Sequence, residues 1–97
     1  MKKNKSIIPG DVLYCCFICG SYDTIQEHHI FGGSVKKTAD KLGMVVHICL
    51  KCHTMIHSSD PEGIELKQML HRLGQRIYEG QIGSREEFIR DFIRSYL

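Results

Sequence analysis

The chain has 97 residues, and its 13 Lys and Arg against 11 Asp and Glu give a formal net charge of +2. A chain of this length folds as one domain with a modest core, so it is expected to need additional stabilisation. The small charge excludes a strong overall field. The sequence carries neither an apolar run of membrane-spanning length nor a secretion signal, and it therefore predicts a cytoplasmic protein with no membrane partner.

The first eleven residues have the composition of a flexible basic arm. Lys, Asn and Ser precede a Pro9-Gly10 turn, and no apolar pattern requires this segment to fold. Residues 12–17 are apolar and prone to β-structure. Residues 24–30 then form the first predicted strand, which carries His28 and His29.

Residues 31–43 are predicted to be a loop, because glycines and lysines occur there without regular spacing. The lysines of this segment are Lys36, Lys37 and Lys41. They form either a solvated charged loop or contacts to the phosphates of a nucleic acid, and their position between the two halves of the candidate site favours phosphate contact. Residues 44–48 form a short apolar run that predicts a buried strand, paired with the first.

Two helices are predicted at the end of the chain. Asp60-Pro61 is typical of a helix start, Gly80 of a helix end, and Ser84 with Glu87 of a capping box. Their apolar stripes are expected to pack on the core or, alternatively, to form a homodimer interface. The stripe residues are Leu66, Leu70, Leu73, Ile77, Phe88, Ile89, Phe92, Ile93 and Tyr96.

Four of the five cysteines fall into two C-x2-C pairs, a spacing that suits one tetrahedral structural zinc ion (Zn²⁺) better than disulfides. The four are Cys16, Cys19, Cys49 and Cys52. A reducing cytoplasm keeps such thiols available for metal binding. Cys15 is left over and is expected to be a packed thiol.

Two histidines follow the second cysteine pair. His53 and His57 have i, i+4 spacing, which places both imidazoles on one face of a short helix. A zinc finger combining them with the first cysteine pair would have too long a gap and would leave the second pair without a metal. A four-sulfur site instead leaves the histidines free for a second metal site with an open coordination position, as catalysis requires.

Together these elements predict an α+β protein. A zinc-stapled core is expected over residues 12–58, and two helices over residues 59–97 are expected to pack on it, so that the whole chain forms one domain.

The Glu27-His28-His29 strand, the short strand after it and the run Cys49-x2-Cys52-His53-x3-His57 resemble the HNH, or ββα-metal, endonucleases. The likeness covers residues 16–57, and zinc-knuckle members of this family are common in bacterial and phage proteins. The resemblance implies a ββα-metal fold, DNA as partner, hydrolysis of its phosphodiester bonds, and a bacterial or phage-infected host cell.

The resemblance also assigns residue roles. It makes His28, His53 and His57 the ligands of one divalent cation, which can be Mg²⁺, Mn²⁺, Ni²⁺ or Zn²⁺. It makes His29 the general base that takes a proton from the attacking water. Three neutral imidazoles leave the charge of the cation uncompensated, so that it acts strongly on the phosphate.

The sequence departs from the family at Met44, where an asparagine that orients the base is expected. The only asparagine is Asn4, in the arm, so a backbone carbonyl or His47 is left to orient His29. This departure keeps open a catalytically degenerate zinc module that binds nucleic acid or a protein partner. A toxin or protein-interaction domain on the same fold is a third reading.

Overall fold

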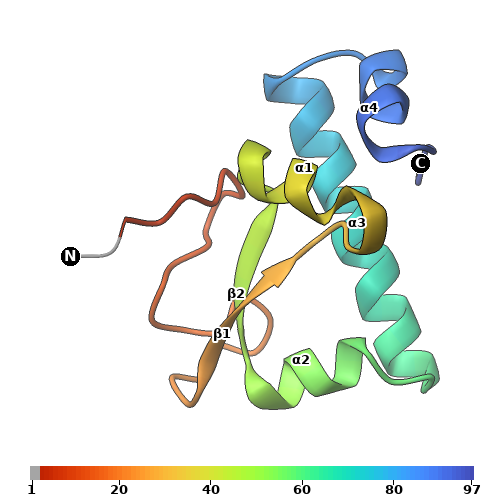
Figure 1. The fold of residues 1–97 in the computed structure, drawn as a ribbon. Coiled ribbons are helices and arrows are strands. Elements are labelled where there is room, and N and C mark those ends of the chain that lie inside the picture. The colour runs from red at the N-terminus through yellow and green to blue at the C-terminus, as the bar shows by residue number, and fades with distance from the viewer. Residues whose placement is uncertain (1–2) are drawn as a thin grey trace.

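The computed structural model describes residues 3–97, and within them the fold is a small α+β domain with a two-stranded sheet and four α-helices (Figure 1). The sheet lies in the middle, α2 crosses one end of it, and α3 runs along one side. The elements are β1 (Ile25–His29), the 3₁₀ turn η1 (Gly33–Val35), α1 (Lys36–Leu42), β2 (Val45–Cys49), α2 (Leu50–Ile56), α3 (Pro61–Gln81) and α4 (Arg85–Phe92).

The two predicted strands are confirmed, and they pair with each other as expected. β1 and β2 are antiparallel, with His28 opposite Val46 and His29 opposite Val45. All five residues of β2 are buried, which explains its continuous apolar run. Because side chains alternate along a strand, Gln26 and His28 lie on one face of β1, and Glu27 and His29 lie on the other.

The prediction of a loop over residues 31–43 is wrong. A 3₁₀ turn leads into α1, which buries Ala39 and ends at Gly43 with a φ of 75°. In this left-handed conformation the Gly43 amide donates to the carbonyls of Ala39 and Asp40, a typical helix C-cap. The helix is short and has no side-chain N-cap, so the sequence carries little local signal for it.

The prediction that nothing in residues 1–11 needs to fold is also wrong for the part that the structure describes; Met1 and Lys2 lie outside the described residues. Ile8 is buried in the core, and the Ile7 amide donates to the Gly43 carbonyl at 3.0 Å. Asp11 is buried as well and accepts hydrogen bonds from the backbone and the ring of His47, both at 2.7 Å. A single carboxylate therefore ties this segment to the centre of β2.

The helix pair α2 and α3 packs through a glycine. A Cβ on Gly63 would clash with the carbonyl oxygen of Met55, so only glycine lets the first turn of α3 approach the last turn of α2. His57 is the C-cap of α2. The position of His57 consequently depends on this close contact.

The C-terminal helices close the core around Phe31. The ring of Phe31 lies 4.5 Å from that of Phe92 and 5.3 Å from that of Phe88, and all three rings are buried. Ser84 and Glu87 form the predicted capping box of α4. Because Phe31 follows β1 by two residues, this aromatic cluster fixes the end of the strand that carries His28 and His29.

The apolar stripes of α3 and α4 are only partly buried in the core. Leu70, Phe88 and Phe92 are buried, whereas Ile89 and Ile93 are exposed. The homodimer interface stays a prediction. Among the described residues, no helix is both long and apolar enough to cross a membrane.

Replacing Gly63 by alanine should destabilise the domain by about 1–3 kcal/mol, because the added methyl group meets a backbone carbonyl that cannot move freely. Gly80→Ala is the matched control. A Cβ there meets nothing within 4 Å, and alanine favours the helix by roughly 0.5–1 kcal/mol. Urea unfolding measures both, and equal stabilities of the two variants would contradict the packing described here.

Candidate functional site

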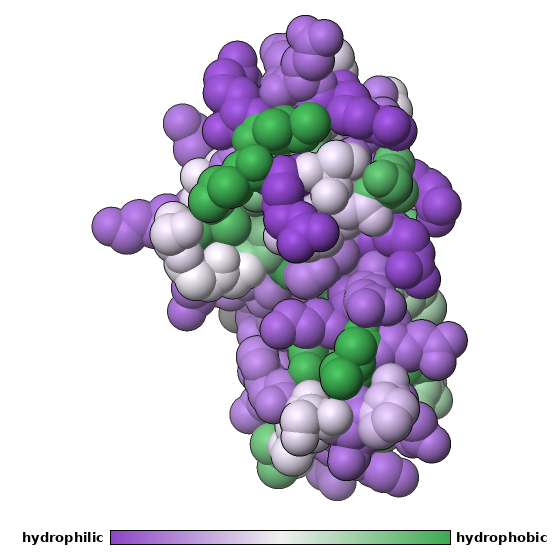
Figure 2. Space-filling view, turned by 90° about the vertical axis from the view of Figure 1, so that its right-hand side faces the viewer, coloured by the Kyte–Doolittle hydropathy of each residue, from purple (hydrophilic) through white to green (hydrophobic). Residues whose placement is uncertain are grey.

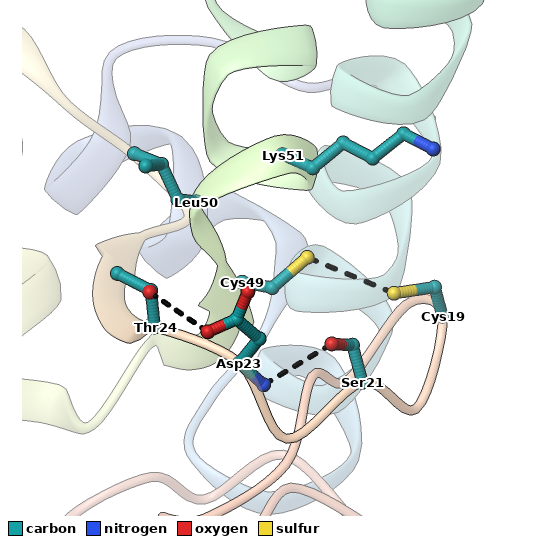
Figure 3. Close-up of a pocket in the computed structure, with 7 residues that line it drawn as sticks. All are labelled: Cys19, Ser21, Asp23, Thr24, Cys49, Leu50 and Lys51. Atoms are coloured by element: carbon teal, nitrogen blue, oxygen red, sulfur yellow. Dashed lines mark hydrogen bonds between the residues drawn. The ribbon is translucent and has the colours of Figure 1, made fainter.

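The four cysteines of the two C-x2-C pairs lie together. Their sulfur atoms are all within 4.8 Å of one another, and the sulfurs of Cys19 and Cys49 are 3.7 Å apart. Figure 3 shows these two sulfurs facing each other from the loop before β1 and from the end of β2. The cluster therefore joins two segments that are far apart in the sequence.

This cluster fits a tetrahedral metal ion. Zinc–sulfur bonds of about 2.3 Å place the sulfurs of a tetrahedron roughly 3.8 Å apart. The amides of Ile18 and Cys19 point at Cys16 Sγ, each at 3.4 Å, and the Cys52 amide points at Cys49 Sγ at 3.5 Å. Such amides stabilise negative charge on sulfur, so the backbone of both loops is arranged for thiolates.

The surroundings of the cluster shift the pKa values of Cys16 and Cys52 in opposite directions. Burial opposes ionisation of Cys16, but backbone amides of Cys19, Cys49 and Ile18 outweigh it and lower the pKa of Cys16 to about 6. Burial and the neighbouring sulfurs raise the pKa of Cys52 well above its usual range. Four thiolates this close repel one another, and a divalent cation removes that repulsion.

A depression beside the cysteine cluster has a volume of 480 Å³ (Figure 3). It carries a single basic side chain, Lys51, and no histidine. Its lining residues belong to the edge of the cysteine cluster. We therefore locate the candidate reactive site elsewhere.

Three histidines, from β1 and from the end of α2, form a second cluster. His28 from β1 lies 5.2 Å from His53 and 5.7 Å from His57, measured between ring centroids, and His53 and His57 are 4.9 Å apart. One nitrogen from each ring lies within 4.8 Å of the others. The antiparallel sheet and the i, i+4 spacing on α2 together produce this triangle.

Two rings of this cluster, those of His28 and His53, are kept neutral by their surroundings, which suits metal binding. Burial, together with the imidazoles of His53 and His57, lowers the pKa of His28 to about 3. Burial and His57 also lower the pKa of His53. The His53 ring is oriented by Gln26, whose Oε1 lies 2.7 Å from Nδ1. Because the carbonyl oxygen accepts, Nδ1 carries the proton and Nε2 keeps a free lone pair for a cation.

His29 lies next to this cluster, but its side chain is on the opposite face of β1. Its Nε2 is 3.0 Å from a carboxylate oxygen of Asp40, on α1. Lys5 contacts both Asp40 and Glu27, the latter at 3.3 Å. Hydrogen bonds from Lys5 and His29 lower the pKa of Asp40, so this carboxylate is ionised at neutral pH.

The three clustered histidines and His29 border one cleft. Its volume is 290 Å³, and its lining residues are Glu27, His28, His29, Gly32, Gly33, Lys36, His53 and His57. His29 is the last residue of β1, so the cleft lies at the end of the strand, where side chains from both faces border the same space. The cleft thus combines a ligand set for a cation with a separate imidazole beside it.

The structure brings only some of the predicted residues to the cleft. Lys36 lines it, whereas Lys37 and Lys41 are exposed on α1 outside it. Met44 is fully buried in the core. His47 is bonded to Asp11 and does not orient His29, and its Nε2 has no hydrogen-bond partner in residues 3–97.

Sequence analysis missed three side chains that organise the site: Gln26, Asp40 and Lys5. Gln26 had a detectable signal, because it lies two residues before His28 and therefore on the same strand face. Asp40 and Lys5 had none, since they come from segments that were not expected to be ordered.

Comparison of the chain with protein-family models, with curated proteins and with solved structures finds no match. Interpretation of the site therefore depends on its residues and their geometry.

Replacing Cys16 by serine should abolish tight zinc binding and unfold most of the protein, because structural zinc contributes about 10–16 kcal/mol in small zinc domains and this exceeds or matches a typical domain stability. Cys15→Ser is the matched control, because the Cys15 sulfur lies outside the cluster. Metal analysis and circular dichroism measure the effect. Zinc loss in both variants, or in neither, would contradict the assignment.

Proposed function

We propose that the chain is a metal-dependent endonuclease of the HNH, or ββα-metal, type that hydrolyses DNA phosphodiester bonds. The observation that carries the proposal is the cleft in which His28, His53 and His57 converge while His29 lies beside them, held by Asp40. A cation-binding triangle and an oriented base at one cleft are the two parts that hydrolysis of a phosphodiester requires.

The histidine triangle supplies the ligands for a divalent cation, Mg²⁺, Mn²⁺, Ni²⁺ or Zn²⁺. When bound, such a cation stabilises negative charge on the phosphate and on the leaving oxygen. The protein contributes three imidazoles and the hydrogen bond from His53 to Gln26, which fixes the orientation of one ligand. The four-cysteine cluster would hold a separate, structural zinc ion.

The tautomer of His29 follows from its partner. An ionised Asp40 carboxylate only accepts hydrogen bonds, so Nε2 of His29 carries the proton and Nδ1 is the free basic nitrogen. His29 takes a proton from water as the water oxygen attacks phosphorus. The bond from phosphorus to the leaving oxygen then breaks, and that oxygen takes a proton from solvent water.

Asp40 supports catalysis over the degenerate-module alternative. That alternative was considered because Met44 stands where an asparagine that orients the base is expected. Asp40, on α1, already orients His29. We also propose that the protein works in the reducing cytoplasm of a bacterial or phage-infected cell, since its cysteines are free thiols suited to metal.

Zinc-loaded protein with added Mg²⁺, Mn²⁺ or Ni²⁺ should nick supercoiled plasmid, and His29→Ala should lower the rate by roughly 10²–10⁴-fold, the usual contribution of a general base. The variant should keep its metal content and melting temperature. Absence of nicking by the wild type with every cation and with branched substrates would reject the enzyme and favour a binding module.

Asp40→Asn should lower kcat by roughly 10–100-fold, in the range found for residues that orient a functional imidazole, because an amide no longer fixes the tautomer. Binding of the second cation, measured by calorimetry, should stay unchanged, and Asp40→Glu should recover part of the rate. A loss of cation binding in Asp40→Asn would instead make Asp40 a structural residue.

A further inference from the structure

The cleft continues into a groove along the C-terminal part of the molecule. A depression of 320 Å³ shares His28, His29 and His57 with the cleft and extends to Lys67, His71 and Tyr96. Two further depressions, of 420 and 290 Å³, overlap with it at His71 and Tyr96. We call this extension, lined by Lys67, His71, Arg72, Arg94 and Tyr96, the basic groove.

The cations of the basic groove are not neutralised by carboxylates. Among residues 3–97, the ion pairs of Lys and Arg side chains engage Lys5, Arg85 and Arg90, and none of them includes Lys67, Arg72 or Arg94. The pKa of His71 is lowered by burial and also by the charges of Lys67 and Arg94. The groove therefore presents positive potential to an anionic ligand.

The groove is built from one helix face and a fixed tail. Lys67 and His71 are four residues apart on α3 and therefore share one helix face, and Arg72 follows His71 directly. Arg94 stacks on the Tyr96 ring at 4.9 Å. The Tyr96 amide donates to Oε1 of Gln75 at 2.6 Å, and Gln75 is fully buried, so the tail is anchored.

The surroundings favour a polar ligand. Figure 2 shows a face, on the α3 side of the molecule, that is largely hydrophilic, with hydrophobic side chains in separate groups. A protein partner usually requires a continuous apolar patch at the centre of its interface. A row of unpaired cations continuous with a phosphodiester-cleaving cleft matches the sugar–phosphate backbone.

We propose that the basic groove holds the DNA backbone on one side of the cleaved bond, so that the strand runs from Lys36 through the cleft to Lys67 and Arg94. This inference rests on the proposed function, because the cleft defines which phosphate is cleaved. Backbone contacts of this kind position DNA without reading its sequence.

The test is the salt dependence of binding to a 20-base-pair duplex, measured by fluorescence anisotropy with every protein carrying His29→Ala so that the DNA survives. Each phosphate contact contributes about 0.9 to the slope of log affinity against log salt. Lys67→Ala with Arg94→Ala should therefore lower the slope by about 1.8, and lower affinity roughly tenfold or more at 0.1 M salt.

Lys51→Ala is the matched control, because Lys51 is exposed and lines the separate depression beside the cysteine cluster. It should leave the slope unchanged. Lys67→Arg with Arg94→Lys preserves charge and should also retain the slope, which separates charge from folding effects. An unchanged slope in the double alanine variant would overturn the proposal that the basic groove holds the DNA backbone.

The outcomes distinguish the two proposals. A plasmid-nicking wild type whose double alanine variant keeps the slope would reject the groove and leave the nuclease. If the double alanine variant lowers the slope as expected but the wild type never cleaves plasmid, the groove is supported as a DNA-binding surface and the nuclease is rejected.

Discussion

The convergence of four sulfurs is the constraint on which the rest of the structure depends. It connects the loop before β1 to the junction between β2 and α2, and α2 carries two of the three clustered histidines. A chain of 97 residues has a modest core, so a metal ion at this junction would add substantially to its stability. A metal at the sulfurs would therefore set the distance between His28 and His53, although it would lie outside the reactive cleft. Stability and site geometry are thus coupled in this fold.

The alternation of side chains along β1 divides the site into two parts with different environments. Gln26 and His28 face α2, where burial keeps the imidazoles neutral and leaves them free to bind a cation. His29, on the opposite face, meets the charged side chain of Asp40. The strand ends at His29, which lets both environments border one cleft. A single five-residue strand therefore gives His28 and His29 different surroundings while keeping both at one cleft.

Much of this arrangement is readable from the sequence, and the exceptions have a common physical cause. The C-x2-C spacing, the i, i+4 histidines and the capping box are local patterns, and each predicted its element. The end of α1 and the packing of residues 3–11 depend on contacts between distant segments, such as the hydrogen bonds from His47 to Asp11. Asp40 was missed for the same reason. Sequence reasoning identified the cysteines and histidines that cluster, and it missed the side chains that hydrogen-bond to these histidines.

The ammonium group of Lys5 has a consequence for where a metal ion can bind. Glu27, His29 and Asp40 offer two carboxylates and an imidazole within 4.8 Å, which by itself is an attractive chelating set for divalent ions. Lys5 contacts both carboxylates, so a positive charge already occupies their shared surroundings. A divalent cation there would be repelled by the ammonium group. The N-terminal segment thereby disfavours a metal ion at Glu27, His29 and Asp40, next to the three histidines that are suited to bind one.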